Sequence, residues 1–270
     1  DYGLTKGITD KILDVIDHGA VNSASIFPNG YAFDYAVEEY KKRRNFRLSI
    51  HLNLAEGLPL SPGEKVHLLT DQEGKFCYTF LQLWQKYHLA SSTTKELMRQ
   101  QVRIELTTQI KKAKQALNLT SSIQVDSHIH YHMIPFVFDA LLDVAKDLPI
   151  SYIRIPNEPF FIAFKEEHWI NNYFGPNIFK HCLLNFLARD YKKRLSRMNI
   201  ASCDYFVGSL FTGNITVGVI QSALLKIKRI APQGSLVEIL LHPGGAEEQE
   251  KHYWKNQEYL GIGPGAFSYL

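Results

Sequence analysis

The sequence contains little cysteine, and this excludes a fold held together by disulfides. Its three cysteines are an odd number and lie far apart, at Cys77, Cys182 and Cys203. They make no disulfide framework, and no two of them have the spacing of a zinc finger. We interpret them as reduced thiols of a cytoplasmic protein.

Long apolar runs and a strong charge imbalance are also missing. No run reaches the roughly 20 apolar residues of a membrane-spanning helix, and no signal peptide is visible. The net charge of +3 is too small to indicate a nucleic-acid partner. Three basic runs lie near the ends of helical patterns, at residues 41–44, 111–114 and 192–194. Cations suit that end of a helix, so we interpret the runs as solvated faces; a patch that meets anionic lipid headgroups is the alternative.

Two motifs of nucleotide and acyl chemistry are absent. The chain has no G-x-x-x-x-G-K and no G-x-S-x-G. A phosphate-cradling loop and a serine nucleophile elbow therefore have no support.

What the chain does contain is an alternation of strand and helix patterns, which predicts an α/β fold with parallel strands. Its 270 residues suit one barrel-like domain over 1–270. Helical periodicity begins at Ile8, so we expect a first strand to lie before Asp1. The expected strands are 21–27, 46–52, 150–156, 203–208 and 235–241, the last of them buried. The expected helices are 8–18, 31–44, 80–88, 93–117, 136–146, 177–197, 217–230 and a polar one after 247.

The helix 93–117 carries two further expectations. Thr93 and Glu96 have the spacing of a capping box. The apolar residues that we expect to face the core are Leu97, Ile104, Ile110 and Leu117.

The most informative stretch is Val125 to His132, where three histidines alternate with other residues after a short apolar run. If the strand continues, His128, His130 and His132 lie on one face. Imidazole is a common metal ligand, and Asp126 can ligate or orient. We interpret the stretch as a metal or catalytic site; a histidine-rich surface loop is the alternative.

Other expected strands also end in polar residues, where reactive groups of α/β folds collect. The residues are His51, Arg154, Asp204 and His242. Arg154 can meet a substrate oxygen or pair with a carboxylate. One carboxylate and two imidazoles with open positions would make a catalytic metal site.

The segment 157–175 is irregular and rich in aromatic residues. We expect an insertion whose rings either stack on sugar or form a small core of their own.

Several motifs, in this order, resemble the YdjC-type carbohydrate deacetylases, which include chitooligosaccharide deacetylases. They are Asp1 to Thr5, Asn29-Gly30, His51 to Leu54 with Glu56 to Leu60, Asp126 to His132, and His242 to Gly244. The resemblance covers almost the whole chain. It implies a distorted (β/α) barrel of the glycoside hydrolase and deacetylase kind, and removal of acetyl from an amino sugar by a metal-dependent enzyme.

The resemblance also implies residue roles. Asp1, His51 and His128 would bind one divalent metal ion, Mg²⁺ or Zn²⁺. Asp1 and His242 would be catalytic, with His242 near the leaving amine. An aspartate before Asp1 would be the general base. Substrate contacts are expected from Asn53, Asp126, His130, His132 and Arg154, with His130 and His132 also placed to support the ligands.

Substrate and partners remain open between alternatives. The sugar would be a soluble chito-oligosaccharide or a lipid-linked sugar, the latter at the inner face of the membrane. A homodimer is compatible with the sequence. The rival functions are an inactive sugar-binding module and a phosphoesterase, which would need more carboxylates beside its histidines.

Overall fold

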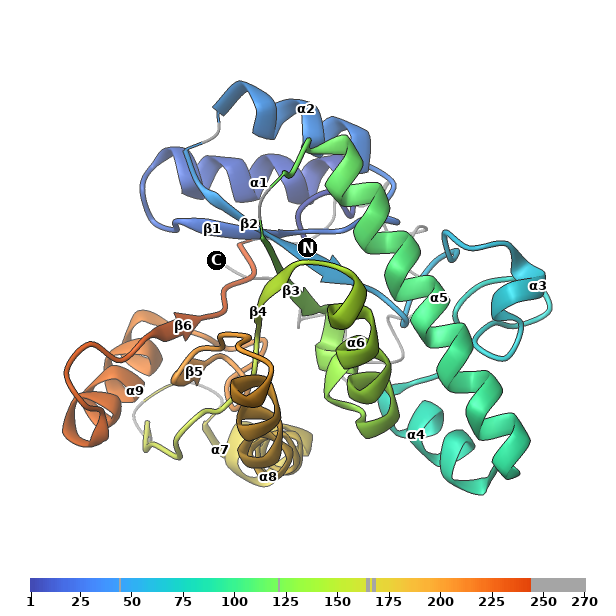
Figure 1. Cartoon of the computed structure of the whole chain (residues 1–270). Coiled ribbons are helices and arrows are strands. Elements are labelled where there is room, and N and C mark those ends of the chain that lie inside the picture. Colours follow the sequence, from blue (N-terminus) through green and yellow to red (C-terminus); the bar gives the residue numbers. More distant parts are fainter. Residues whose placement is uncertain (44, 121, 164–165, 167–168, 244–270) are drawn as a thin grey trace. The chain divides into compact units, whose positions relative to one another are not determined.

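The structure is a computed structural model that describes residues 1–43, 45–120, 122–163, 166 and 169–243 (Figure 1). It divides into two compact units, with Asp1–Ser151 in the first and Tyr152–His242 in the second. We describe each unit by itself. One domain over the whole chain stays a prediction.

The first unit is built on a sheet with the strand order β1-β2-β3-β4. Its strands are β1 (Ser23–Ile26), β2 (Arg47–Leu52), β3 (Ile123–Ser127) and the start of β4 (Ile150–Ile153). β2 pairs in parallel with β1 and with β3, and Tyr2 forms a parallel bridge to Ile26 at the edge of β1. Parallel pairing requires crossovers, and the helices between the strands supply them.

Six α-helices and one 3-10 helix belong to the described part of this unit. They are α1 (Lys6–Asp17), α2 (Phe33–Arg43), α3 (Gly63–Val66), α4 (Phe80–Leu89), α5 (Ser92–Ala116), η1 (His128–Met133) and α6 (Pro135–Asp147). The predicted helices and strands of this unit are found within a few residues of the expected bounds. The predicted loop 61–75 also contains the short helix α3.

The details predicted for α5 are wrong in two respects. Its N-cap is Ser91, whose side chain accepts from Thr94 N, and the capping box lies on α4 instead, between Thr79 and Gln82. Of the four apolar residues expected to face the core, Leu97 and Ile104 are 40% and 38% exposed, whereas Ile110 and Leu117 are buried as predicted. The buried face includes polar residues, which a count of apolar positions misses: Met98, Gln101, Val102, Glu105, Leu106, Gln109, Ile110 and Ala113.

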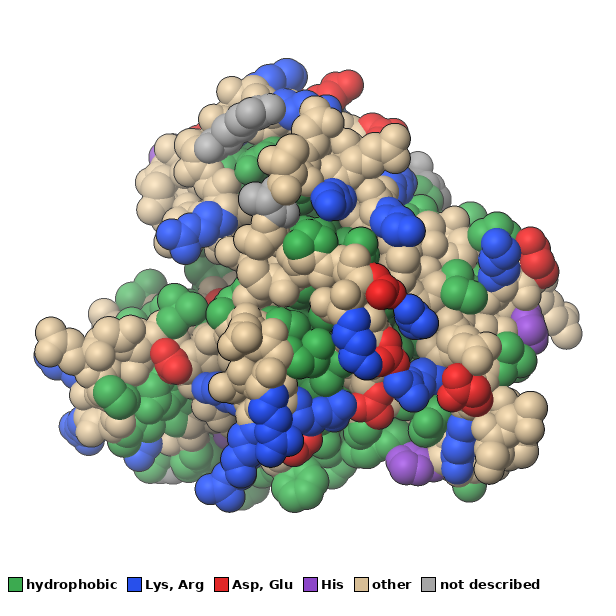
Figure 2. All heavy atoms as spheres, in the orientation of Figure 1, with side chains coloured by type: hydrophobic (Ala, Val, Ile, Leu, Met, Phe, Trp, Pro, Cys, Tyr) green, Lys and Arg blue, Asp and Glu red, His purple; other side chains and the backbone are tan. Residues whose placement is uncertain are grey.

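Charges of both signs are mixed over α5 and α6 on the face shown in Figure 2. Arg99 pairs with Asp143, and Arg103 with Asp147 at 2.6 Å, across the two helices. Exposed pairs of this kind contribute little stability. The pairs show Arg99 and Arg103 at the surface of α5; the solvated-face interpretation of the basic run 111–114 stays a prediction.

The second unit contains a two-stranded parallel sheet of β5 (Tyr205–Val207) and β6 (Val237–Ile239). Its helices are α7 (Trp169–Phe174), α8 (Pro176–Arg197) and α9 (Val217–Ile230). The expectation of a buried strand at 235–241 is wrong, because β6 is short and its residues are half-buried or exposed. The helix expected after 247 lies outside the described residues.

The aromatic segment 157–175 contributes to a core of the second unit. Phe161 and Tyr173 are buried beside Phe211 and Val207, and Trp169 packs against the same cluster. Tyr173 also donates a hydrogen bond from its hydroxyl to Phe161 O at 2.8 Å. For these rings the alternative of a small core is the one observed. Within the described residues, no helix is both long and apolar enough to cross a membrane.

Gly30 allows the turn after β1 to approach the start of the chain, and this generates a testable prediction. A β-carbon at Gly30 would overlap Gly3 O and lie 2.9 Å from Leu4 Cα. We expect Gly30→Ala to lower the free energy of unfolding by roughly 1–3 kcal/mol, the usual cost of overpacking, measured by urea titration. Gly63→Ala is the control, because nothing lies within 4 Å of the added carbon. Equal stability of the two variants would contradict the prediction.

Candidate metal centre

His51 and Asp126 are brought together by the register of β2 and β3. The two residues are direct partners in the parallel pairing, near the C-terminal ends of both strands. His51 Nδ1 lies 2.8 Å from Asp126 Oδ1, and Ser25 Oγ donates to Asp126 Oδ2 at 2.6 Å. Because an ionised carboxylate only accepts, the His51 proton belongs on Nδ1 and Nε2 carries the lone pair.

Burial keeps His51 neutral. It lowers the pKa of His51 to about 3, although the neighbouring Asp126 opposes the shift. His51 is 5% exposed and Asp126 is 1% exposed. A neutral imidazole with its lone pair on Nε2 is the form that ligates a metal.

Asp1 faces both imidazoles. Tyr2 N donates to Ser25 O at 3.0 Å, which holds the start of the chain beside β1. Asp1 Oδ1 then lies 3.3 Å from His51 Nε2 and 3.1 Å from His128 Nδ1. Phe27 packs against both imidazole rings, with centroids 5.3 and 5.1 Å away.

The spacing of these groups fits a shared cation. One ligand atom from each of Asp1, His51 and His128 lies within 4.8 Å of the others. Ligands about 2.0–2.1 Å from one zinc ion in tetrahedral geometry lie roughly 3.3 Å apart. A carboxylate with two imidazoles suits zinc and related ions, and leaves positions for a substrate or water.

The histidine stretch folds differently from its prediction. β3 ends at Ser127, and η1 begins at His128 with positive φ angles of 48° at Ile129 and 57° at His130. The expectation that three histidines share one strand face is therefore wrong. The turn sends His128 to Asp1, while His132 Nδ1 lies 2.6 Å from Ser127 Oγ.

His130 and His132 are buried, at 6% and 1% exposure. The Ser127 hydroxyl also accepts from His132 N at 2.9 Å, so His132 holds the turn that carries His128. This agrees with a supporting place for His132. Substrate binding by either residue stays a prediction.

Glu56 is a residue of the site that the sequence reasoning did not single out. His128 Nε2 lies 3.1 Å from Glu56 Oε1, on the side of the ring opposite the Nδ1 that faces Asp1. The available signal was its place in the loop after β2, since strand-end loops of α/β folds collect functional groups.

The Asn53 side chain is held by hydrogen bonds to its own loop and to Asn29. It is 0% exposed, and its side-chain oxygen accepts from Ala55 N and Glu56 N. Its amide nitrogen donates to Glu56 O at 2.7 Å and to Asn29 Oδ1 at 3.2 Å. These four bonds use the full capacity of the amide, so Asn53 shapes the loop that carries Glu56. A substrate contact of Asn53 stays a prediction. Asp126 is also buried, and it contacts His51 Nδ1. Of the two roles considered for Asp126, to ligate a metal or to orient a ligand, this contact fits the second.

Arg154 and His242 belong to the second unit. Arg154 Nε donates to Glu238 Oε1 at 2.6 Å, so the carboxylate alternative is the one observed. Tyr152 donates to the other oxygen of Glu238, also at 2.6 Å. His242 is half-buried and follows β6. A substrate contact of Arg154 and a catalytic role of His242 stay predictions.

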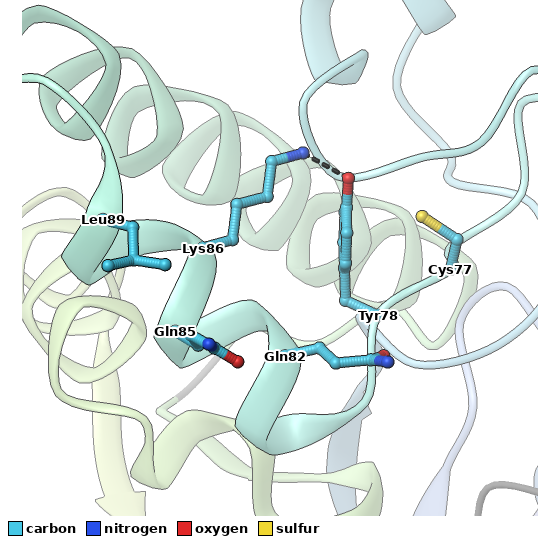
Figure 3. A pocket seen from close by; sticks show the side chains of 6 residues that line it. All are labelled: Cys77, Tyr78, Gln82, Gln85, Lys86 and Leu89. Carbon is cyan, nitrogen blue, oxygen red and sulfur yellow. Dashed lines mark hydrogen bonds between the residues drawn. The ribbon is translucent and has the colours of Figure 1, made fainter.

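A separate surface pocket of about 360 Å³ lies on α4 (Figure 3). Its lining is Cys77, Tyr78, Gln82, Gln85, Lys86 and Leu89. Lys86 reaches across it to the Tyr78 hydroxyl. None of these residues belongs to the cluster of Asp1, His51 and His128, so the pocket is distinct from the metal centre.

The fold and the cluster define an α/β protein with a candidate site for one divalent cation. The chain belongs to the YdjC-like family, whose model matches residues 1–262. This membership confirms the resemblance that the motifs indicated.

Three similar proteins are named as carbohydrate or chitooligosaccharide deacetylases. The chain is 31% identical over 175 residues to a carbohydrate deacetylase of Oceanobacillus iheyensis, covering 64% of this chain and 70% of the relative. It is 24% identical over 221 residues to a chitooligosaccharide deacetylase of Yersinia enterocolitica, covering 78% and 81%. A mouse carbohydrate deacetylase is 25% identical over 248 residues, covering 90% and 76%.

One solved structure shows the same fold. It is an Enterococcus faecalis protein described as a candidate for cellobiose-phosphate cleavage, with a TM-score of 0.66 and 18% identity. The match covers 95% of this chain and 82% of that chain. It confirms the predicted α/β fold class.

The geometry predicts which histidines control metal affinity. We expect His51→Ala and His128→Ala each to raise the Kd for Zn²⁺ by more than the roughly 10–100-fold typical of losing an outer partner. Isothermal titration calorimetry measures this. His181→Ala is the matched control, because His181 is also buried beside a carboxylate, Glu158, at 3.1 Å. Unchanged affinity in either site variant would exclude this cluster as the metal site.

Proposed function

We propose that the protein is a metal-dependent hydrolase that removes the N-acetyl group from an acetylated amino sugar. The observation that carries the proposal is the buried cluster of Asp1, His51 and His128. It occurs in a family whose relatives are named carbohydrate deacetylases and a chitooligosaccharide deacetylase.

The reaction breaks an amide bond by adding water to the acetyl carbon, and it yields acetate and a free amine. A divalent cation, Mg²⁺ or Zn²⁺, would supply Lewis acidity toward the acetyl oxygen and toward water. The chain's own part is to hold the ligands in a fixed arrangement. Asp126 holds His51 through Nδ1, and Phe27 packs against both imidazoles.

Proton transfer requires an acid and a base besides the ligands. We assign the acid, which protonates the leaving amine, to His242, as the resemblance implies. In the family motif the base is an aspartate adjacent to the ligand aspartate.

The candidate ligand set, which contains one carboxylate, counts against the phosphoesterase alternative. The sequence suggested few carboxylates beside the histidines, yet three contact them: Asp1, Glu56 and Asp126. Only Asp1 is in the candidate ligand set, while the other two bind the ring nitrogens that face away from Asp1. This set suits one ion better than the two-metal sites frequent in phosphoesterases.

The substrate class is tested by acetate release from two kinds of sugar. We expect full-length protein to release acetate from N-acetylated chito-oligosaccharides or from a detergent-solubilised lipid-linked amino sugar, measured by an enzyme-coupled acetate assay. Chelator should abolish release and added Zn²⁺ or Mg²⁺ restore it. Because a misplaced catalytic group costs about 100-fold, His128→Ala should lower the rate by at least that factor.

The two substrates also separate the alternatives. Release from the lipid-linked sugar alone would assign the protein to membrane-associated substrates, and release from chito-oligosaccharides alone to soluble ones. No release from either, with the metal still bound, would reject the deacetylase. Sugar binding without turnover would then indicate a binding module, and phosphate release from a sugar phosphate a phosphoesterase.

A further inference from the structure

Glu56 has a buried carboxylate, and among the described residues this carboxylate contacts one hydrogen-bonding side chain, that of the candidate metal ligand His128. Glu56 is 7% exposed, and its Oε1 lies 3.1 Å from His128 Nε2. Its Oε2 is buried and has no hydrogen-bond partner among the described residues. A buried carboxylate is costly unless it is paired, and His128 Nε2 is the group within hydrogen-bonding distance of Oε1.

The loop that carries Glu56 is fixed by polar contacts to α5 and to the turn after β1, and by bonds within the loop. Gln109 of α5 donates to Asn53 O at 2.7 Å and accepts from Asn53 N at 2.8 Å. Asn53 in turn binds the backbone of Glu56 at both N and O. Asn29, from the turn after β1, donates to Leu58 O at 3.0 Å. These bonds hold the loop backbone in place and thereby fix the position of the Glu56 side chain relative to His128.

The two imidazoles of the cluster share one pattern of contacts with carboxylates. Each has one nitrogen toward Asp1 Oδ1 and the other toward a buried carboxylate, Asp126 for His51 and Glu56 for His128. Ligating histidines commonly donate their second N–H to such a group, which fixes the tautomer and the ring orientation.

We propose that Glu56 is a positioning residue that holds His128 with its proton on Nε2 and its lone pair on Nδ1, ready for the metal. Asn53 serves this function by bonding to the backbone of Glu56, and Asn29 by bonding to Asn53 and to Leu58 O. The motif Asn53 to Glu56 is thereby explained as a support of the metal centre. The inference rests on the metal site of the proposed function and is independent of which sugar is bound.

The test measures metal affinity and the His128 tautomer. Glu56→Ala should raise the Kd for Zn²⁺ by about 10–100-fold, the usual effect of removing an outer partner, in calorimetry. Glu56→Gln keeps an acceptor oxygen and should recover part of that loss. In ¹⁵N NMR of histidine-labelled, zinc-loaded protein, the His128 Nε2–H signal should be single in the wild type and exchange-broadened or replaced by the other tautomer in Glu56→Ala.

Glu158→Gln is the matched control. Glu158 is 1% exposed and lies 3.1 Å from the Nδ1 of a buried histidine, His181, but touches no member of the metal cluster. Glu158 also accepts from the backbone N of Gly208 at 2.6 Å and of Leu210 at 2.7 Å. Replacing its carboxylate therefore weakens several buried hydrogen bonds and should destabilise the fold. We expect a lower melting temperature with unchanged zinc affinity.

Two results would overturn the inference. One is zinc affinity and a His128 tautomer in folded Glu56→Ala equal to the wild type. The other is a loss of affinity in Glu158→Gln as large as in Glu56→Ala, which would indicate general destabilisation. Absence of acetate release with intact zinc binding would reject the proposed function and leave this inference standing.

Discussion

A buried carboxylate must find hydrogen-bond donors, and the parallel pairing of β2 with β3 supplies one to Asp126. The register places His51 directly beside it, and Ser25 of β1 donates to its second oxygen. Three adjacent strands thus meet at one carboxylate. The arrangement also fixes the tautomer of His51. Because Nδ1 carries the proton, Nε2 presents its lone pair toward Asp1. A shift of register by one residue would turn His51 to the other face of the sheet and remove the site.

The second imidazole is held by a loop rather than by a strand. Gln109 on α5 binds the backbone of Asn53, and Asn53 shapes the loop that brings Glu56 to His128. Long helices usually present an apolar stripe to the core, yet α5 buries Gln109 and Glu105 because loop amides and carbonyls need partners there. The polar face of α5 is therefore part of what builds the metal centre.

Much of the architecture follows from local patterns. The alternation of helix and strand periods, Pro135 at the start of α6 and the apolar residues of α1 all predict the elements that the structure contains. His51 and His128 could also be predicted as site residues, because histidines at the ends of expected strands are easily recognised in a sequence. Such features depend on residues close together in the chain, where steric and periodic preferences act without help from the rest of the fold.

Other features were decided only by the tertiary structure. The alternating histidines predicted a longer strand, but Ile129 and His130 adopt positive φ angles, in a turn where Ser127 and His132 are bonded to each other. Asn53 and Asp126, which were expected at the substrate, hold Glu56 and His51 in this structure. Residues that lie far apart in the sequence make these contacts, and Asp126 and Ser25 are separated by 101 positions. The sequence by itself determined the elements and the candidate ligands; the tertiary structure determined which polar group supports each ligand, because burial and pairing exist only once the chain is folded.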